Sequence, residues 1–148
     1  MGMSITGFEN MEKKFDESYL TQEMKFAMED TVEFTKDVIV DTIENSGTDK
    51  TWSRAWFGRT GTGRARVNTG EMRNSVNTDV TVVKNGVVEG RAGWLEGTPT
   101  YLKFQEFGFR HWITGEYIEG MQSLREGAEQ GEQEAVRLLD KIAKDMAK

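Results

Sequence analysis

The sequence predicts an α+β fold in which two long helices pack on a small antiparallel sheet. Apolar residues recur at helical spacing over residues 18–45 and again over 116–147. Between these segments, Asn85 and Gly86 join two stretches of alternating polarity, which is a strong signal for a β-hairpin over 79–95. With 148 residues, 36% apolar and 30% charged, the chain is expected to form a single globular domain over 1–148.

The N-terminal helix is predicted over about 18–45. Its apolar positions follow one another at spacings of three to five residues, with Thr35 filling the gap in the stripe: Tyr19, Met24, Met28, Val32, Ile39 and Ile43. Acidic residues occupy the opposite face, which we expect to be solvated. The sequence "NSG" at 45–47 favours a helix end, because glycine adopts the left-handed conformation readily.

Residues 47–68 are interpreted as an extended loop or arm. The sequence "TDKTWSRAWFGRTGTGRARVN" has no regular period, although a helical turn could pair Trp52 with Trp56. Loops of this length in compact domains are usually functional or mobile. The aromatic residues Trp52, Trp56 and Phe57 are expected to find a surface on which to bury.

Residues 69–115 are expected to form the hairpin core. A short helix in "NTGEMRNSV" buries Met72 and Val76, and strands follow at 79–84 and 87–95 with a two-residue turn between them. Pro99 opens a helix in "PTYLKFQEF" that Gly108 ends, and "FRHWITG" is predicted to be extended, as a third strand. We expect Glu106 to lie on an exposed face of this helix.

The C-terminal helix is predicted over 116–147. One face carries apolar residues along its whole length: Ile118, Met121, Leu124, Ala128, Ala135, Leu138, Ile142 and Met146. Three glycines at 120, 127 and 131 weaken its middle by roughly 1 kcal/mol each relative to alanine. They allow a bend or a close contact with another helix.

The formal charge of −6 hides a basic segment. Residues 51–75 carry a net +4, whereas residues 1–50 carry −7 and residues 116–148 carry −3. An acidic body repels phosphate, so the arginines interleaved with tryptophan favour a protein interface over general DNA binding. A module that binds nucleic acid through residues 54–73 remains the alternative.

No catalytic or cofactor motif stands out. The sequence "GRTGTGR" lacks the Gly-Lys-Ser/Thr ending of a phosphate-binding loop, and the chain has no cysteine and no Asp-x-Asp-x-Asp loop. The one histidine, His111, lacks a paired carboxylate at fixed spacing and is interpreted as a packing or hydrogen-bonding residue. No apolar run is long enough to cross a membrane. We therefore expect a protein that is not an enzyme and that uses no cofactor or metal.

Two short motifs resemble those of one protein family. "NTGEMRNSV" is similar to a Thr-Gly-x-Leu/Met-x-x-Ser turn and helix before a strand, and "YLKFQEFGF" is similar to a Tyr-Ala-x-x-Val-Glu-Phe-Gly segment after a hairpin. Their order and spacing over residues 20–145 resemble the tail-completion, or head–tail joining, proteins of long-tailed bacteriophages, often called minor tail components. The matched residues are Thr69, Gly70, Met72, Arg73, Ser75, Tyr101, Glu106, Phe107 and Gly108. The chain departs from the family after Gly108 and at "TGEYIEG", before the last helix.

The resemblance implies a structural virion protein that is made in the host cytoplasm. Such proteins form homo-oligomeric rings, commonly of six subunits, at the neck between the capsid connector and the tail tube. Their partners are the adjacent connector or stopper and the tail-terminator or tail-tube proteins, and DNA passes through the lumen without specific binding. A tail-terminator or head-closure ring is the nearest alternative. The predicted interface residues are Trp52, Arg54, Trp56, Phe57, Arg59, Arg64, Arg66, Arg73, Tyr101, Glu106 and Phe107.

Overall fold

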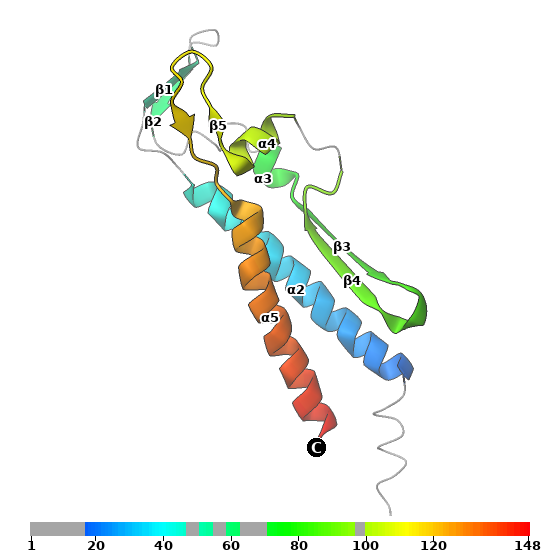
Figure 1. Ribbon diagram of the computed structural model, residues 1–148. Helices are drawn as coiled ribbons and strands as arrows, with labels where there is room; N and C mark the ends of the chain where they lie inside the picture. Colours follow the sequence, from blue (N-terminus) through cyan, green and yellow to red (C-terminus); the bar gives the residue numbers. More distant parts are fainter. Residues whose placement is uncertain (1–16, 47–50, 55–58, 63–70, 97–99) are drawn as a thin grey trace, which may run out of the picture.

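The computed structural model of the chain (Figure 1) describes residues 17–46, 51–54, 59–62, 71–96 and 100–148. It contains both long helices and short antiparallel strand pairs, so the predicted α+β class is confirmed. In chain order the elements are α2 (Glu17–Asn45), β1 (Thr51–Arg54), β2 (Arg59–Thr62), α3 (Glu71–Asn74), β3 (Asn77–Val82), the 3-10 helix η3 (Lys84–Gly86), β4 (Val88–Gly93), α4 (Thr100–Phe107), β5 (Phe109–Arg110), β6 (Tyr117–Ile118) and α5 (Ser123–Met146).

Helix α2 is the central element, with α5 along one side and the β3–β4 hairpin along another (Figure 1). Glycines permit both contacts. A Cβ atom at Gly90 of β4 would lie 2.6 Å from Val32 of α2, and one at Gly127 of α5 would lie 2.6 Å from Ile39. A Cβ at Gly131 would meet the hydroxyl of Thr35. Of the three glycines expected to allow a bend or a close helix contact, Gly127 and Gly131 make a close contact with α2.

The main core lies at the C-terminal end of α2. Ile39 and Ile43 are almost fully buried there. They are surrounded by residues from α3, the link between α3 and β3, α4 and the segment before α5: Met72, Val76, Leu102 and Met121. The indole of Trp94 borders this cluster and donates a hydrogen bond to the carbonyl of Met72 at 2.8 Å. The predicted burial of Met72 and Val76 is confirmed.

The β3–β4 hairpin is confirmed, but its turn is one residue longer than predicted. Val82 pairs with Val88, and the amide of Val83 donates to the carbonyl of Val87 at 2.7 Å. Three residues of η3 then close the turn, with Gly86 at a φ of +73°. A turn of three residues that ends in a left-handed glycine is a common hairpin form. The Asn-Gly pair therefore lies in the turn as predicted, but the strand register differs by one residue from that of a two-residue turn.

The loop expected over 47–68 contains a hairpin where the structure describes it. β1 and β2 pair antiparallel, with Thr51 opposite Thr62 and Trp52 opposite Gly61. A helical turn at Trp52 is therefore wrong. Threonine and tryptophan favour strands, but four-residue strands are too short for a period-2 pattern to reveal them.

The last helix begins at Ser123, so the start predicted at residue 116 is wrong. Residues Tyr117–Ile118 form β6, which pairs with β5 in a separate hairpin and does not extend the β3–β4 sheet. Gln122 has a φ of +53°, which is incompatible with a continuous helix. The amides of Met121 and Gln122 instead donate to carbonyls at the end of α4.

Candidate interaction surface

Glu106 joins α4 to the start of α5. Its side chain is only 3% exposed, and its Oε2 accepts a hydrogen bond from the hydroxyl of Ser123 at 2.6 Å. Its Oε1 accepts a hydrogen bond from the backbone amide of Leu124 at 2.7 Å. A carboxylate at this place satisfies an unpaired amide of the first helical turn and faces the positive end of the helix dipole. The expectation that Glu106 is exposed is wrong, because it caps a helix that is distant in sequence.

The end of α4 is capped in return by the backbone before α5. The amide of Met121 donates to the carbonyl of Gln105 at 2.9 Å, and the amide of Gln122 donates to the carbonyl of Glu106 at 3.1 Å. The chain approaches α4 this closely because residue 120 is glycine; a Cβ at Gly120 would collide with the backbone of α4. We call this reciprocal capping the α4–α5 junction. It fixes the direction in which α4 and the β5–β6 hairpin project.

The side of α4 opposite the core is aromatic. Leu102 and Glu106 face inward, whereas Tyr101, Phe104 and Phe107 are exposed at spacings of three residues. Phe107 is 71% exposed. Phe104 contacts Phe109 of β5 edge to face, with ring centroids 5.9 Å apart, so the exposed aromatic surface continues onto the hairpin.

The tip of the β5–β6 hairpin, residues 111–116, presents two large apolar side chains. Trp112 is 88% exposed and Ile113 is 68% exposed. The tip is held by backbone bonds of 2.8 Å from the His111 amide to the Glu116 carbonyl and from the Gly115 amide to the His111 carbonyl. The Nδ1 of His111 lies 3.3 Å from the donating amide of Thr114, so the predicted hydrogen-bonding role of His111 is confirmed.

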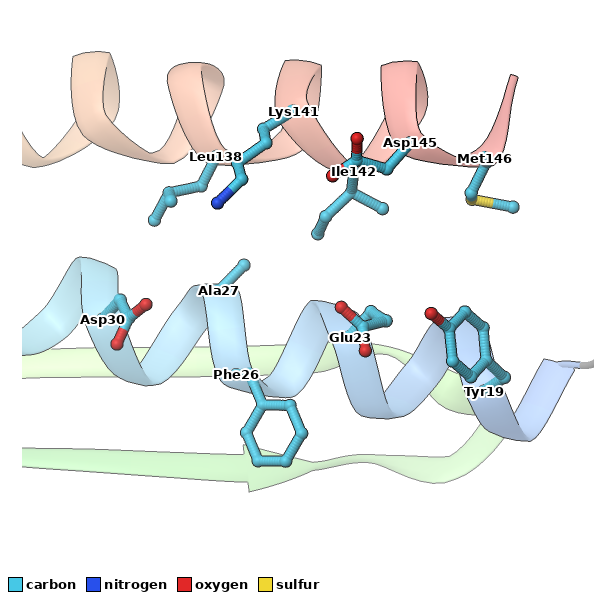
Figure 2. A pocket seen from close by; sticks show the side chains of 10 residues that line it. All are labelled: Tyr19, Glu23, Phe26, Ala27, Asp30, Leu138, Lys141, Ile142, Asp145 and Met146. Atoms are coloured by element: carbon cyan, nitrogen blue, oxygen red, sulfur yellow. The ribbon is translucent and has the colours of Figure 1, made fainter. Parts of the chain in front are cut away.

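A groove of about 250 Å³ lies between the N-terminal half of α2 and the C-terminal half of α5. Figure 2 shows Leu138, Ile142 and Met146 of α5 pointing toward α2, from which Ala27 points back. Charged groups also line it, three of them acidic and one basic: Glu23, Asp30, Asp145 and Lys141. We call this feature the α2–α5 groove.

The seven predicted interface residues of the arm fall either on β1 and β2 or outside the described ranges. Trp52, Arg54 and Arg59 belong to β1 and β2, which the structure describes through the backbone pairing alone. The other four residues of the arm lie outside the described ranges: Trp56, Phe57, Arg64 and Arg66.

The predicted interface residues Arg73 and Tyr101 each have a partner on a neighbouring element. Arg73 pairs with Glu44 of α2 at 2.8 Å, which reduces its availability to phosphate. The Tyr101 hydroxyl lies 3.4 Å from a carboxylate oxygen of Glu71. Desolvation, followed by the negative charge of Glu71, raises the pKa of the Tyr101 phenol above its ordinary value.

The described ranges show no cluster suited to metal chemistry. Within them, no group of three or more histidine or acidic side chains could hold a metal ion. None of the described helices is both long enough and apolar enough to cross a membrane. The features that remain are apolar surfaces, which suit contact with other proteins.

The sequence contained a signal for the hairpin tip that residue-by-residue analysis missed. Turns favour glycine, proline, asparagine, aspartate and serine, yet "HWITG" places tryptophan and isoleucine in a turn. Large apolar residues in an exposed turn indicate an interaction surface. The α2–α5 groove left no comparable signal, because Leu138 and Ile142 have the spacing of ordinary core residues.

No protein-family model, curated protein or solved structure matches the chain.

Proposed function

We propose that the chain is a structural virion protein that forms a ring at the head–tail junction of a long-tailed bacteriophage, as a tail-completion protein. It would join the tail tube to the capsid connector and leave a passage for DNA. The proposal assigns no catalytic role to any residue. Its sequence basis is the order and spacing of the Thr-Gly and Glu-Phe-Gly motifs over residues 20–145.

The observation that carries the proposal is the balance between exposed and buried apolar side chains. Among the described residues, fifteen large apolar side chains are exposed, whereas eight hydrophobic residues form the buried core. Single exposed apolar residues are normal, but contiguous ones mark interaction sites. Six of the fifteen lie together on α4 and the β5–β6 hairpin, which favours a subunit that completes its burial by assembly.

The Glu-Phe-Gly motif fits a subunit of this kind. Glu106 is used within the chain as the cap of α5, while its neighbour Phe107 is directed outward. Gly108 has a φ of +81°, and a Cβ there would meet the carbonyl of Ile118 at 2.6 Å. One short motif thus fixes the junction and presents an aromatic side chain to a partner.

Electron microscopy of the purified protein tests the proposal. Negatively stained particles are expected to show closed rings with a central opening, and the rings are expected to attach to the ends of purified tail tubes or to connectors. A protein that remains monomeric and binds neither tubes nor connectors would contradict the proposal. Strong, salt-dependent binding to DNA that is lost in Arg59→Ala, Arg64→Ala and Arg66→Ala variants would instead support the nucleic-acid alternative.

A further inference from the structure

The hairpin tip and the α2–α5 groove, two apolar surfaces formed by described residues, differ in shape. The hairpin tip projects, with Trp112 and Ile113 at its end, whereas the α2–α5 groove is concave and partly apolar. A cavity of about 150 Å³ is enough to take up benzene. The groove, at about 250 Å³, is large enough for an indole ring.

We propose that the hairpin tip of one copy of this chain inserts Trp112 into the α2–α5 groove of the next copy. This inference rests on the proposed ring and specifies the contact that would build it. The contact is heterologous, since it joins a projecting surface to a different, hollow surface, and contacts of this type generate rings or open filaments.

A chain cannot fill its own groove with its own tip. The tip precedes the first residue of α5, whereas the groove is lined by Leu138, Ile142 and Met146 near its end. At 1.5 Å per residue, the nineteen positions from Ser123 to Ile142 separate the two surfaces by about 30 Å. Figure 1 shows the hairpin and the C-terminus at opposite ends of α5.

The exposed aromatic area is of the order that a stable interface needs. A large aromatic side chain presents about 150–250 Å². With exposed fractions of 71%, 88% and 59%, Phe107, Trp112 and Tyr117 together offer roughly 400 Å². This is about half of the ~800 Å² that each partner buries in an interface of standard size. On the other copy, Tyr19 lines the groove and is itself exposed, so it adds aromatic area on the groove side of the contact.

The charges of the two surfaces are complementary in both directions. Arg110 is exposed at the base of the tip, and the groove carries Glu23, Asp30 and Asp145. The tip also carries Glu116, and the groove carries Lys141. Such pairs at the rim of an apolar contact fix its register and direction more than its strength.

The test is a mixing experiment with two variants, each of which removes one side of the contact. Trp112→Ala removes the projecting side chain, and Ala27→Phe fills the groove. Each variant alone is expected to be monomeric by mass photometry, where the wild type is oligomeric. Mixed in equal amounts, the two variants retain one intact tip and one intact groove, so they are expected to form a dimer and nothing larger.

Two controls keep the result interpretable. Val136→Ala shortens an exposed apolar side chain on α5 outside the groove and is expected to leave the wild-type oligomer unchanged. Met146→Glu places a charge in the groove at the last turn of α5. It is the second groove variant, to be used if circular dichroism shows that Ala27→Phe does not fold.

Several outcomes would overturn the proposed contact. Trp112→Ala with an unchanged oligomer, or an equimolar mixture that stays monomeric, would contradict it even if the wild type forms rings, and the proposed function would then stand. Loss of assembly in Trp112→Ala but not in either groove variant would show that the tip binds a surface other than the groove, and would also contradict it. A wild type that does not assemble at all would contradict both proposals.

Discussion

Replacing Glu106 tests whether the α4–α5 junction holds the fold together. Glu106→Ala removes two hydrogen bonds to a buried carboxylate, from the Ser123 hydroxyl and the Leu124 amide. It leaves those donors without their acceptor in a site where Ser123 is completely buried. A buried unsatisfied donor costs about 1–3 kcal/mol, and a lost helix cap costs about 0.5–2 kcal/mol. Because these costs overlap at the Leu124 amide, we expect a loss of about 3 kcal/mol in the free energy of unfolding.

The assay is urea denaturation followed by circular dichroism, at one protein concentration because assembly also changes apparent stability. With a urea dependence of about 2 kcal/mol per molar, the midpoint of Glu106→Ala should fall by about 1.5 M. Glu106→Gln keeps the shape and one acceptor oxygen but loses the charge that faces the helix dipole. It should therefore lose about 1–2 kcal/mol.

Glu129→Gln is the matched control, because Glu129 is an exposed carboxylate on α5, the helix that Glu106 caps, and pairs with Arg125 at 2.9 Å. Exposed pairs of this kind contribute about 0.3–0.5 kcal/mol. If the free energies of unfolding of Glu106→Ala and Glu129→Gln agree within about 0.5 kcal/mol, the assignment of Glu106 as the cap of α5 is refuted.

Three further predictions concern the close contacts at glycines and the raised pKa of Tyr101. Gly120→Ala should lower the free energy of unfolding by more than about 3 kcal/mol or prevent folding, since its Cβ would collide with the α4 backbone. Gly115→Ala, at a φ of +67° with open space around it, should lower it by about 1 kcal/mol. Equal denaturation midpoints for the two variants would contradict this. Gly131→Ala should lower the free energy of unfolding by about 1–2 kcal/mol although alanine favours helix more than glycine, because the new methyl group meets the side chain of Thr35 on α2. A higher melting temperature for this variant would refute the close contact. The pKa of Tyr101, measured by absorbance as the difference between the titrations of wild type and Tyr101→Phe, should lie above the ordinary tyrosine value. It should fall in Glu71→Gln; an unchanged pKa would show that Glu71 does not contribute.

The long elements could be predicted because their patterns repeat. The stripe from Val32 to Ile43 and the alternation around Asn85 extend over enough residues to identify a helix and a hairpin, and both are present. The end of α4 at Gly108 was also predictable, because the position needs a positive φ. These features depend on local sequence alone.

The remaining features depend on contacts between residues that are distant in sequence. The burial of Glu106 follows from the position of α5, seventeen residues further along, and its surrounding sequence reads as an ordinary amphipathic helix. The start of α5 was misplaced for the same reason. The apolar spacing continues back to Ile118, but the left-handed φ of Gln122 and the backbone hydrogen bonds of Met121 and Gln122 to α4 exclude a helix there. The hairpin tip and the groove are recognised as surfaces only when the exposure of their side chains is known.

The stoichiometry of the purified wild-type protein tests the central claim most directly. Native mass spectrometry at micromolar concentration is expected to show one closed oligomer of defined subunit number, because a ring of heterologous contacts leaves no free tip or groove. A spectrum that contains the 16.8 kDa monomer alone across that concentration range would contradict assembly through these surfaces.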